Sequence, residues 1–178
     1  MKEKEKESVP GIEIGAWAIV PAAEEDRHEL MALYKVQHGR LYCPWDEEYP
    51  SEADITYDLS RDSLFVMKLD GGTGRIIASI TLDQDEQVEQ LDCWRPELQP
   101  GGELSRLAVA PDFQNRGLAR KMLQFGMEEL KRRGFRSTHF LVNRNNVKAL
   151  RSYAAFEFDV VGECELYGQP FLCYEKAL

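Results

Sequence analysis

The feature that most constrains the fold is an apolar, strand-like run that leads directly into a helical pattern across one short polar turn. In the stretch "SRLAVAPDFQNRGLARKML", residues 105–123, the run ends at Pro111, and Gly117 stands between Arg116 and Arg120. A helix N-terminus presents unpaired backbone N–H groups and a partial positive charge, so a glycine-containing turn there makes an anion site. Two arginines at a helix start are unfavourable unless an anion compensates them, which supports a phosphate-bearing ligand.

The remaining segments alternate between strand and helix patterns in a mixed order. Leu30, Leu33, Tyr34 and Gln37 follow one another at helical spacing, and Ser51 and Asp54 form a capping box for a second helix. We expect strands at 16–20, 63–69, 75–84, 102–110, 137–142, 158–168 and 169–178, with an Asp-Gly-Gly-Thr-Gly hairpin turn between the second and third. We expect helices at 22–39, 51–59, 116–134 and 145–156. This order predicts an α/β fold with a central mixed sheet flanked by helices. We expect a charged N-terminal tail over residues 1–14 and a single domain over residues 15–178.

Charge and composition exclude several classes of protein. The formal net charge of −9 disfavours phosphate neutralisation, so we expect no nucleic acid partner. No stretch approaches the roughly 18 apolar residues of a membrane span, and the Lys/Glu-rich N-terminus has no apolar signal region. We therefore expect no membrane association and a cytoplasmic location.

The cysteines and histidines show no metal-binding pattern. Cys43, Cys93, Cys164 and Cys173 form no C-x-x-C pair, which favours reduced thiols, although the last two flank a turn and a disulfide across that hairpin stays open. The histidines at positions 28, 38 and 139 form no metal set either, so we expect no metal ion.

Two motifs together resemble the GCN5-related N-acetyltransferase (GNAT) superfamily. The pattern Gln114-x-x-Gly117-x-Ala119 after a strand is similar to the family's acyl-CoA pyrophosphate loop, Q/R-x-x-G-x-G/A. Downstream, "VNRNNVKALRSYAAFEF" matches the family pattern V-x-x-x-N-x-x-A-hydrophobic-x-x-Y-x-x-x-G-F at Val142, Asn146, Ala149, Leu150, Tyr153 and Phe158. The sequence departs from it at Glu157, where the family usually has glycine.

The resemblance implies a GNAT-like acyl-CoA N-acyltransferase fold and acetyl-CoA as co-substrate. Residues of the strand before the loop, of the loop itself and of the following helices then bind it: Leu107, Ala108, Val109, Gln114, Asn115, Arg116, Gly117, Leu118, Ala119, Arg120, Asn146 and Ala149. The resemblance further assigns Glu103 as the catalytic carboxylate and Tyr153 as the group that faces the thioester sulfur.

The chemistry gives each of these two residues a role. An amine attacks only when neutral, so Glu103 would remove its proton directly or through a water molecule. A phenol with a pKa of about 10 can protonate a departing thiolate, whose pKa is about 8.5, and Tyr153 would fill that role. Structural roles stay open for both: Glu103 as a solvated strand start, and Tyr153 as an aromatic at the core edge.

Two acidic segments carry the candidate acceptor contacts. Residues 40–54 and 83–97 are rich in acids and contain Trp45, Tyr49 and Trp94, which would suit a cationic amine. The same aromatic residues could instead pack these loops onto the sheet. The sequence predicts an N-acetyltransferase acting on a primary amine of a small molecule, as a monomer or homodimer. The alternatives are acetylation of a protein N-terminus or lysine, and a non-catalytic acyl-CoA-binding domain.

Overall fold

A seven-stranded mixed sheet forms the centre of the structure, a computed structural model that describes residues 15–41 and 43–178. The strand order is β1-β2-β3-β4-β5-β7-β6, and every neighbouring pair is antiparallel except β4 and β5. The strands are β1 (Trp17–Pro21), β2 (Leu64–Leu69), β3 (Ile76–Asp83), β4 (Gly101–Val109), β5 (Ser137–Asn143), β6 (Asp159–Leu166) and β7 (Gln169–Ala177). The predicted mixed sheet is thereby confirmed, whereas the expected tail over residues 1–14 lies outside the described residues.

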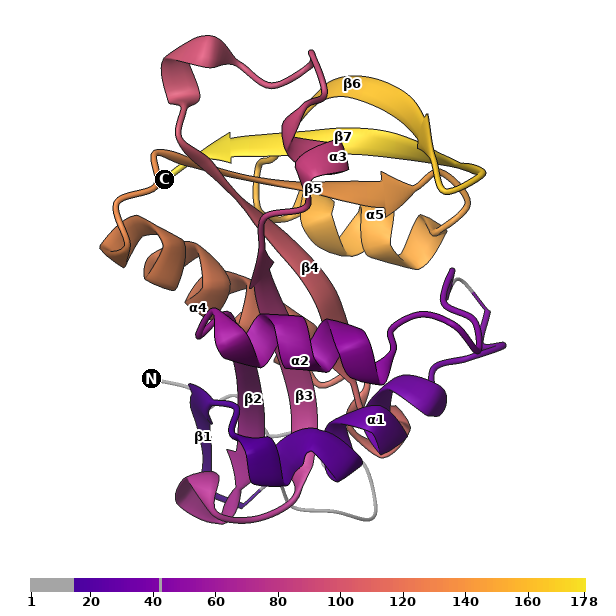
Figure 1. Ribbon diagram of the computed structural model, residues 1–178, viewed down its shortest axis with the longest axis vertical. Coiled ribbons are helices and arrows are strands. Elements are labelled where there is room, and N and C mark those ends of the chain that lie inside the picture. Colours follow the sequence, from indigo (N-terminus) through magenta and orange to yellow (C-terminus); the bar gives the residue numbers. More distant parts are fainter. Residues whose placement is uncertain (1–14, 42) are drawn as a thin grey trace, which may run out of the picture.

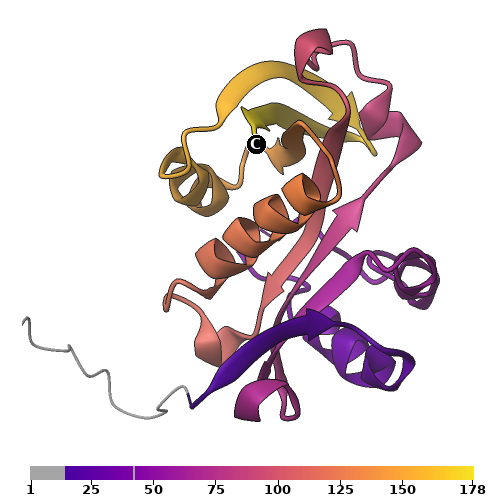
Figure 2. The same ribbon diagram turned by 90° about the vertical axis from the view of Figure 1, so that its left-hand side faces the viewer.

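Helices cover both faces of the sheet. Figure 2 shows α4 and α5 on one side of it and α1 and α2 on the other. The helices are α1 (Arg27–Lys35), α2 (Glu52–Ser60), α3 (Glu86–Glu89), α4 (Leu118–Arg132) and α5 (Val147–Ala154). No helix within the described part of the chain is both long and apolar enough to cross a membrane.

Local sequence explains where the main helices begin and what they bury. At α2 the predicted capping box is present: Ser51 N–H donates to the Asp54 carboxylate at 2.7 Å, and Asp54 N–H donates to Ser51 Oγ at 3.4 Å. On α4, Gly126 allows close packing on the sheet, since a Cβ there would lie 2.7 Å from the Leu104 side chain. This helix packs against β3 and β4.

The feature that positions the site is the short contact between β4 and β5. They pair only where Gly101–Glu103 faces Ser137–His139, whereas β5 continues to pair with β7 up to Asn143. In Figure 1, β5 and β7 run roughly horizontally, whereas β2, β3 and β4 run closer to the vertical. The strands therefore separate immediately after Glu103.

A bulge in β4 follows directly. Ser79 pairs with Ala108 and Thr81 with Ser105, so Arg106 and its neighbour both oppose one residue of β3. Arg106 has a φ of +46°, the left-handed region that a non-glycine residue rarely adopts. The bulge re-aims this arginine toward the α2 side of the sheet.

The segment between β3 and β4 was expected to be a plain polar loop, but it contains α3 and a 3-10 turn at Pro96–Leu98. Trp94 anchors it: its indole N–H donates to the Val88 carbonyl at 2.7 Å, and its ring stacks on His139 with centroids 4.5 Å apart. The segment thus packs across the sheet beside Glu103.

Candidate active site

A cavity of about 850 Å³ lies where β4 and β5 separate. Its walls come from β4, β5, the turn before α4, and α5, and it extends past the gap to the α1 side at Gln37, Arg40 and Trp45. All the predicted cofactor-binding residues except Arg116 line it: Leu107, Ala108, Val109, Gln114, Asn115, Gly117, Leu118, Ala119, Arg120, Asn146 and Ala149. The structure therefore brings the two sequence motifs together at one cavity.

The turn before α4 has the geometry of an anion site. Asn115 and Gly117 have φ values of +60° and +77°, and Gly117 is the N-cap residue, without a side-chain cap. The N–H groups of the first turn have no intrahelical partner, and this turn contains no acidic residue. A Cβ at Gly117 would meet no atom of residues 15–41 and 43–178 within 4 Å, so the described part of the chain leaves the space in front of the turn open.

Aromatic rings hold the two arginines of this turn. The Arg120 guanidinium lies over the Phe156 ring at 5.2 Å, and that of Arg116 over the Phe113 ring at 5.5 Å. Two guanidinium groups beside the positive end of a helix dipole make this corner of the cavity strongly attractive to anions.

The end of β4 is braced by glutamine side chains. Gln37 and Gln114 donate to the Val109 carbonyl at 3.0 and 3.1 Å, and Arg40 donates to the Gln114 side chain at 3.2 Å. Ala110 N–H bonds to β3, so the alternating groups of Val109 and Leu107 point toward the open side of β4. Gln114, the glutamine of the Gln-x-x-Gly-x-Ala motif, thus helps to fix the end of β4.

Helix α5 brings Tyr153 to the cavity wall. Asn146 caps the helix by accepting from Ala149 N–H at 3.0 Å, a local role that the motif reading did not foresee. The Tyr153 ring packs on Phe140, with centroids 4.6 Å apart, and lies 6.3 Å from Tyr174. Burial raises the pKa of Tyr153 to about 12, so the hydroxyl stays protonated near neutral pH and is available as a proton donor.

Glu103 lies on the other face of the sheet, at the point where β4 and β5 separate. The register places one titratable residue on each of five adjacent strands in a single row: Asp83, Glu103, His139, Glu175 and Asp159. Side chains opposite one another in a ladder share a face, so Glu103 lies between Asp83 and His139. It does not line the cavity, but its neighbour Leu104 does.

The Glu103 carboxyl is buried and has no ion-pair partner among the described residues. Glu103 is 6% exposed, and the Asp85 N–H donates to its carboxyl in a long hydrogen bond of 3.4 Å. Within residues 15–41 and 43–178, no ion pair reaches it. Burial and, secondly, the Asp83 carboxylate raise the pKa of Glu103 well above its usual value, which makes the ionised form a stronger base.

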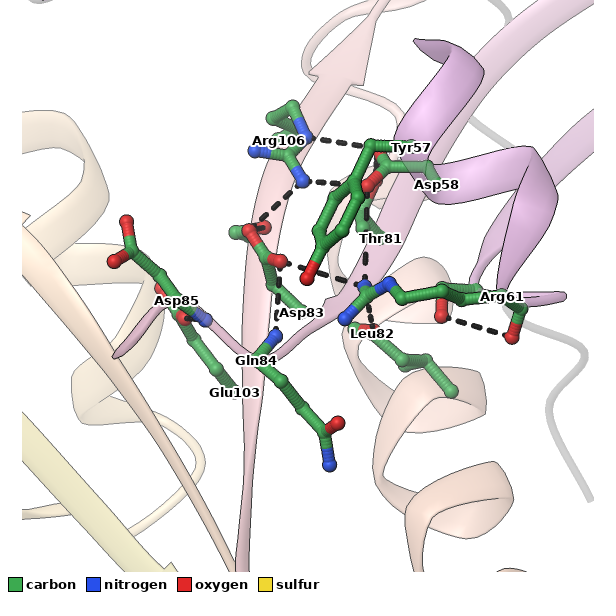
Figure 3. A network of polar contacts seen from close by, with 12 residues as sticks. Tyr57, Asp58, Arg61, Thr81, Leu82, Asp83, Gln84, Asp85, Glu103 and Arg106 are labelled. Carbon is green, nitrogen blue, oxygen red and sulfur yellow. Dashed lines mark hydrogen bonds and ion pairs between the residues drawn. The ribbon is translucent and has the colours of Figure 1, made fainter. Parts of the chain in front are cut away.

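Nearby carboxylates are instead paired with arginines (Figure 3). Arg106 donates to both Asp58 oxygens, at 2.9 and 2.7 Å, and forms an ion pair with Asp83 at 2.8 Å. Arg61 reaches Asp83 at 3.4 Å. Arg106 also donates to the Tyr49 hydroxyl at 3.0 Å, so this buried network positions a residue of the loop before α2.

The three aromatic residues predicted to contact the acceptor lie in different environments. Trp45 lines the cavity and packs edge-on against Tyr34, with centroids 5.4 Å apart. Tyr49 is 39% exposed next to the Arg106 network. Trp94 is 8% exposed and stacks on His139, which gives it the packing role that the sequence had left open.

Tyr167 and Asp85 complete the surroundings of Glu103, and sequence reasoning missed both. The Tyr167 hydroxyl, from the β6–β7 turn, donates a short hydrogen bond to Asp85. Burial and the hydrogen bond to Asp85 raise the pKa of Tyr167. Asp85 thus links Tyr167 to Glu103, because its backbone N–H donates to the Glu103 carboxyl. A Tyr-Gly turn carries no sequence signal for such a contact. Among the described residues, no group of His, Cys, Asp or Glu is arranged to hold a metal ion.

Comparison with known proteins agrees with this geometry. The family model "Acetyltransferase (GNAT) family" matches residues 27–158. A search of curated proteins found no match. Among solved structures, the ribosomal-protein-S18-alanine N-acetyltransferase of Escherichia coli is 18% identical, with a TM-score of 0.69 and coverage of 91% of this chain and 94% of that chain. PaiA N-acetyltransferase from Thermoplasma acidophilum, solved in complex with coenzyme A, is also 18% identical with a TM-score of 0.69, covering 92% and 99%.

Proposed function

Because the chain belongs to the acetyltransferase (GNAT) family, we propose that it transfers an acetyl group from acetyl-CoA to a primary amine of a cationic small molecule. The observation that carries this proposal is the gap between β4 and β5. On one face the gap opens into the cavity that bears the anion-binding turn and Tyr153, and on the other it starts at Glu103. Two reactants could therefore approach from opposite faces and meet at the gap.

The residues present fit acetyl-CoA. The left-handed Gly117, the uncapped start of α4 and the basic side chain of Arg120 suit its phosphates, and the unpaired edge of β4 suits its amide-bearing arm. When bound, acetyl-CoA supplies the acetyl thioester. The backbone N–H groups on the open side of β4 then offer hydrogen bonds to a carbonyl oxygen that gains negative charge.

Glu103 and Tyr153 carry out the two proton transfers of the reaction. Glu103, without an ion-pair partner among the described residues and with a raised pKa, accepts a proton from the substrate ammonium group directly or through a water molecule, which leaves the neutral amine that attacks the thioester carbon. Tyr153, protonated at neutral pH, donates its proton to the departing sulfur. We expect kcat/KM to rise with pH through the raised pKa of Glu103, since only its ionised form can act as a base.

The surroundings of Glu103 support a cationic acceptor. Asp85 donates its backbone N–H to Glu103 and accepts from the Tyr167 hydroxyl, and the positive charges of Arg61 and Arg106 are engaged by Asp58 and Asp83. A substrate ammonium group would provide the cation that this spot lacks. A lysine side chain or a protein N-terminus is the competing acceptor, and a non-catalytic acyl-CoA-binding domain is the competing function.

The test is a steady-state assay of thiol release with acetyl-CoA and a panel of diamines, polyamines, amino acids and peptides. With an accepted amine, Glu103→Gln and Tyr153→Phe should each lower kcat by about 10²-fold. Tyr174→Phe is the matched control, because it removes a hydroxyl from a neighbouring ring that does not line the cavity.

Three outcomes would contradict parts of the proposal. Unchanged kcat in both variants would remove these two residues from the mechanism. Turnover with peptides alone would reassign the acceptor to a protein. Coenzyme A binding without turnover of any amine would favour the non-catalytic domain.

A further inference from the structure

Three of the four cysteines lie together, two from one hairpin and Cys93 from a segment distant in the sequence. Cys164 and Cys173 come from the adjacent strands β6 and β7, and their sulfur atoms are 3.9 Å apart. Cys93 comes from the segment between α3 and β4. Together with Cys164 it packs against the small buried cluster formed by Val88, Trp94 and Cys173. The structure thus joins three thiols from three segments at one place.

Cys93 lies directly over the strand pair that contains Cys173. Gly162 is the ladder partner of Cys173, and a Cβ built on Gly162 would fall 2.6 Å from the Cys93 Cβ and 3.5 Å from its sulfur. Only the absence of a side chain at Gly162 allows this approach.

Backbone geometry distinguishes the two pairs that could be bonded. Cys164 faces Phe171 rather than Cys173, so the two hairpin cysteines are diagonal neighbours. Diagonal neighbours have Cα atoms about 7–8 Å apart, beyond the upper limit of about 6.8 Å for a disulfide. Cys93 is not in a strand, so its backbone can adjust to reach Cys173.

We propose that Cys93 and Cys173 form a disulfide when the protein meets hydrogen peroxide, and that this bond fastens the segment over residues 84–98 to the β6–β7 hairpin. In the first step the half-buried Cys93 sulfur attacks one peroxide oxygen, which breaks the O–O bond, releases water and leaves a sulfenic acid. The fully buried Cys173 sulfur then attacks this sulfenic sulfur, and the hydroxyl leaves as a second water. Two thiols lose two electrons and two protons, and one peroxide becomes two waters.

The bond would reinforce contacts that already hold this segment. Arg95 pairs with Glu175 at 2.6 Å and with Asp159 at 2.9 Å, and Glu89 lies 2.8 Å from His139 Nε2. Near the start of the segment, Asp85 accepts a hydrogen bond from Tyr167 of the same hairpin. A crosslink at its middle would therefore limit its motion relative to β6 and β7.

The test treats the reduced full-length chain with a few equivalents of hydrogen peroxide, blocks remaining thiols by alkylation, and measures the intact mass without reductant. We expect a loss of two hydrogens, two alkylated cysteines instead of four, and a higher Tm that a reductant reverses. Peptide mapping locates the bond: trypsin leaves Cys164 and Cys173 on one peptide, so cleavage after Glu165 is needed to separate them.

Variants make the assignment decisive. Cys93→Ser and Cys173→Ala should lose the crosslink, whereas Cys164→Ser and the distant control Cys43→Ser should keep it. A mapped bond between Cys164 and Cys173, a bond to Cys43, or four alkylated cysteines after treatment would each overturn the proposal.

Discussion

At the scale of single residues, Glu103 combines a functional position with a cost in stability. Burial of its carboxyl and, secondly, the charge of Asp83 raise its pKa in the folded state. Between the unfolded pKa of about 4.3 and the raised folded value, the folded state binds more protons than the unfolded state. Stability contributed by the protonated form is therefore lost as pH rises through this window.

Glu103→Gln should remove that loss. We expect the variant to have a higher Tm than the wild type at pH 8 and a similar Tm near pH 4, so that the difference grows with pH. Thermal unfolding at several pH values measures it, and Glu165→Gln on the exposed edge of β6 is the control, which should show no growth. A Tm difference that does not change with pH would mean that the charge of Glu103 does not destabilise the folded state.

At the scale of elements, the turn that ends α5 explains a departure from the family pattern. Glu157 stands where that pattern has glycine, and its φ of +58° is in the left-handed region. A side chain there costs about 1–2 kcal/mol, partly offset by the greater entropy of glycine in the unfolded chain. Glu157→Gly should raise the unfolding free energy by up to about 1 kcal/mol in urea titrations. Glu157→Ala keeps the strain and should bring no such gain; an equal gain in both variants would place the cause in the charge of Glu157.

Elements with their own periodicity could be predicted, and contacts between elements could not. Helix α4 and the turn at Gly117 follow from one continuous stretch, because apolar spacing and a glycine mark them locally. Helix α3 has only four residues, too few to show a helical period, so it was missed. The neighbours of Glu103 depend on the register of five strands, and Tyr167 reaches Asp85 only because two distant turns meet.

At the scale of the whole molecule, the short β4–β5 contact divides the chain into two halves that share one cavity. Helix α4 and the end of β4 supply its anion-binding corner, while β5 and α5 supply Tyr153 and the wall opposite. A ligand that spans the cavity contacts both halves, so it should stabilise the fold as a unit. Coenzyme A at about 100 times its dissociation constant would add roughly 2.7 kcal/mol, which raises the Tm of a chain of this size by several degrees.

The matched pair Gly117→Asp and Gly117→Asn tests whether this stabilisation passes through the turn before α4. Both side chains tolerate the left-handed conformation better than most, and a Cβ at this position meets no atom within 4 Å, so both variants should fold. They differ in charge alone. We expect the shift with coenzyme A to vanish in the aspartate variant, because its carboxylate repels the phosphates, and to persist in reduced form in the asparagine variant. A shift of wild-type size in the aspartate variant would place the phosphates elsewhere, whereas equal losses in both would indicate that bulk, and not charge, closes the site.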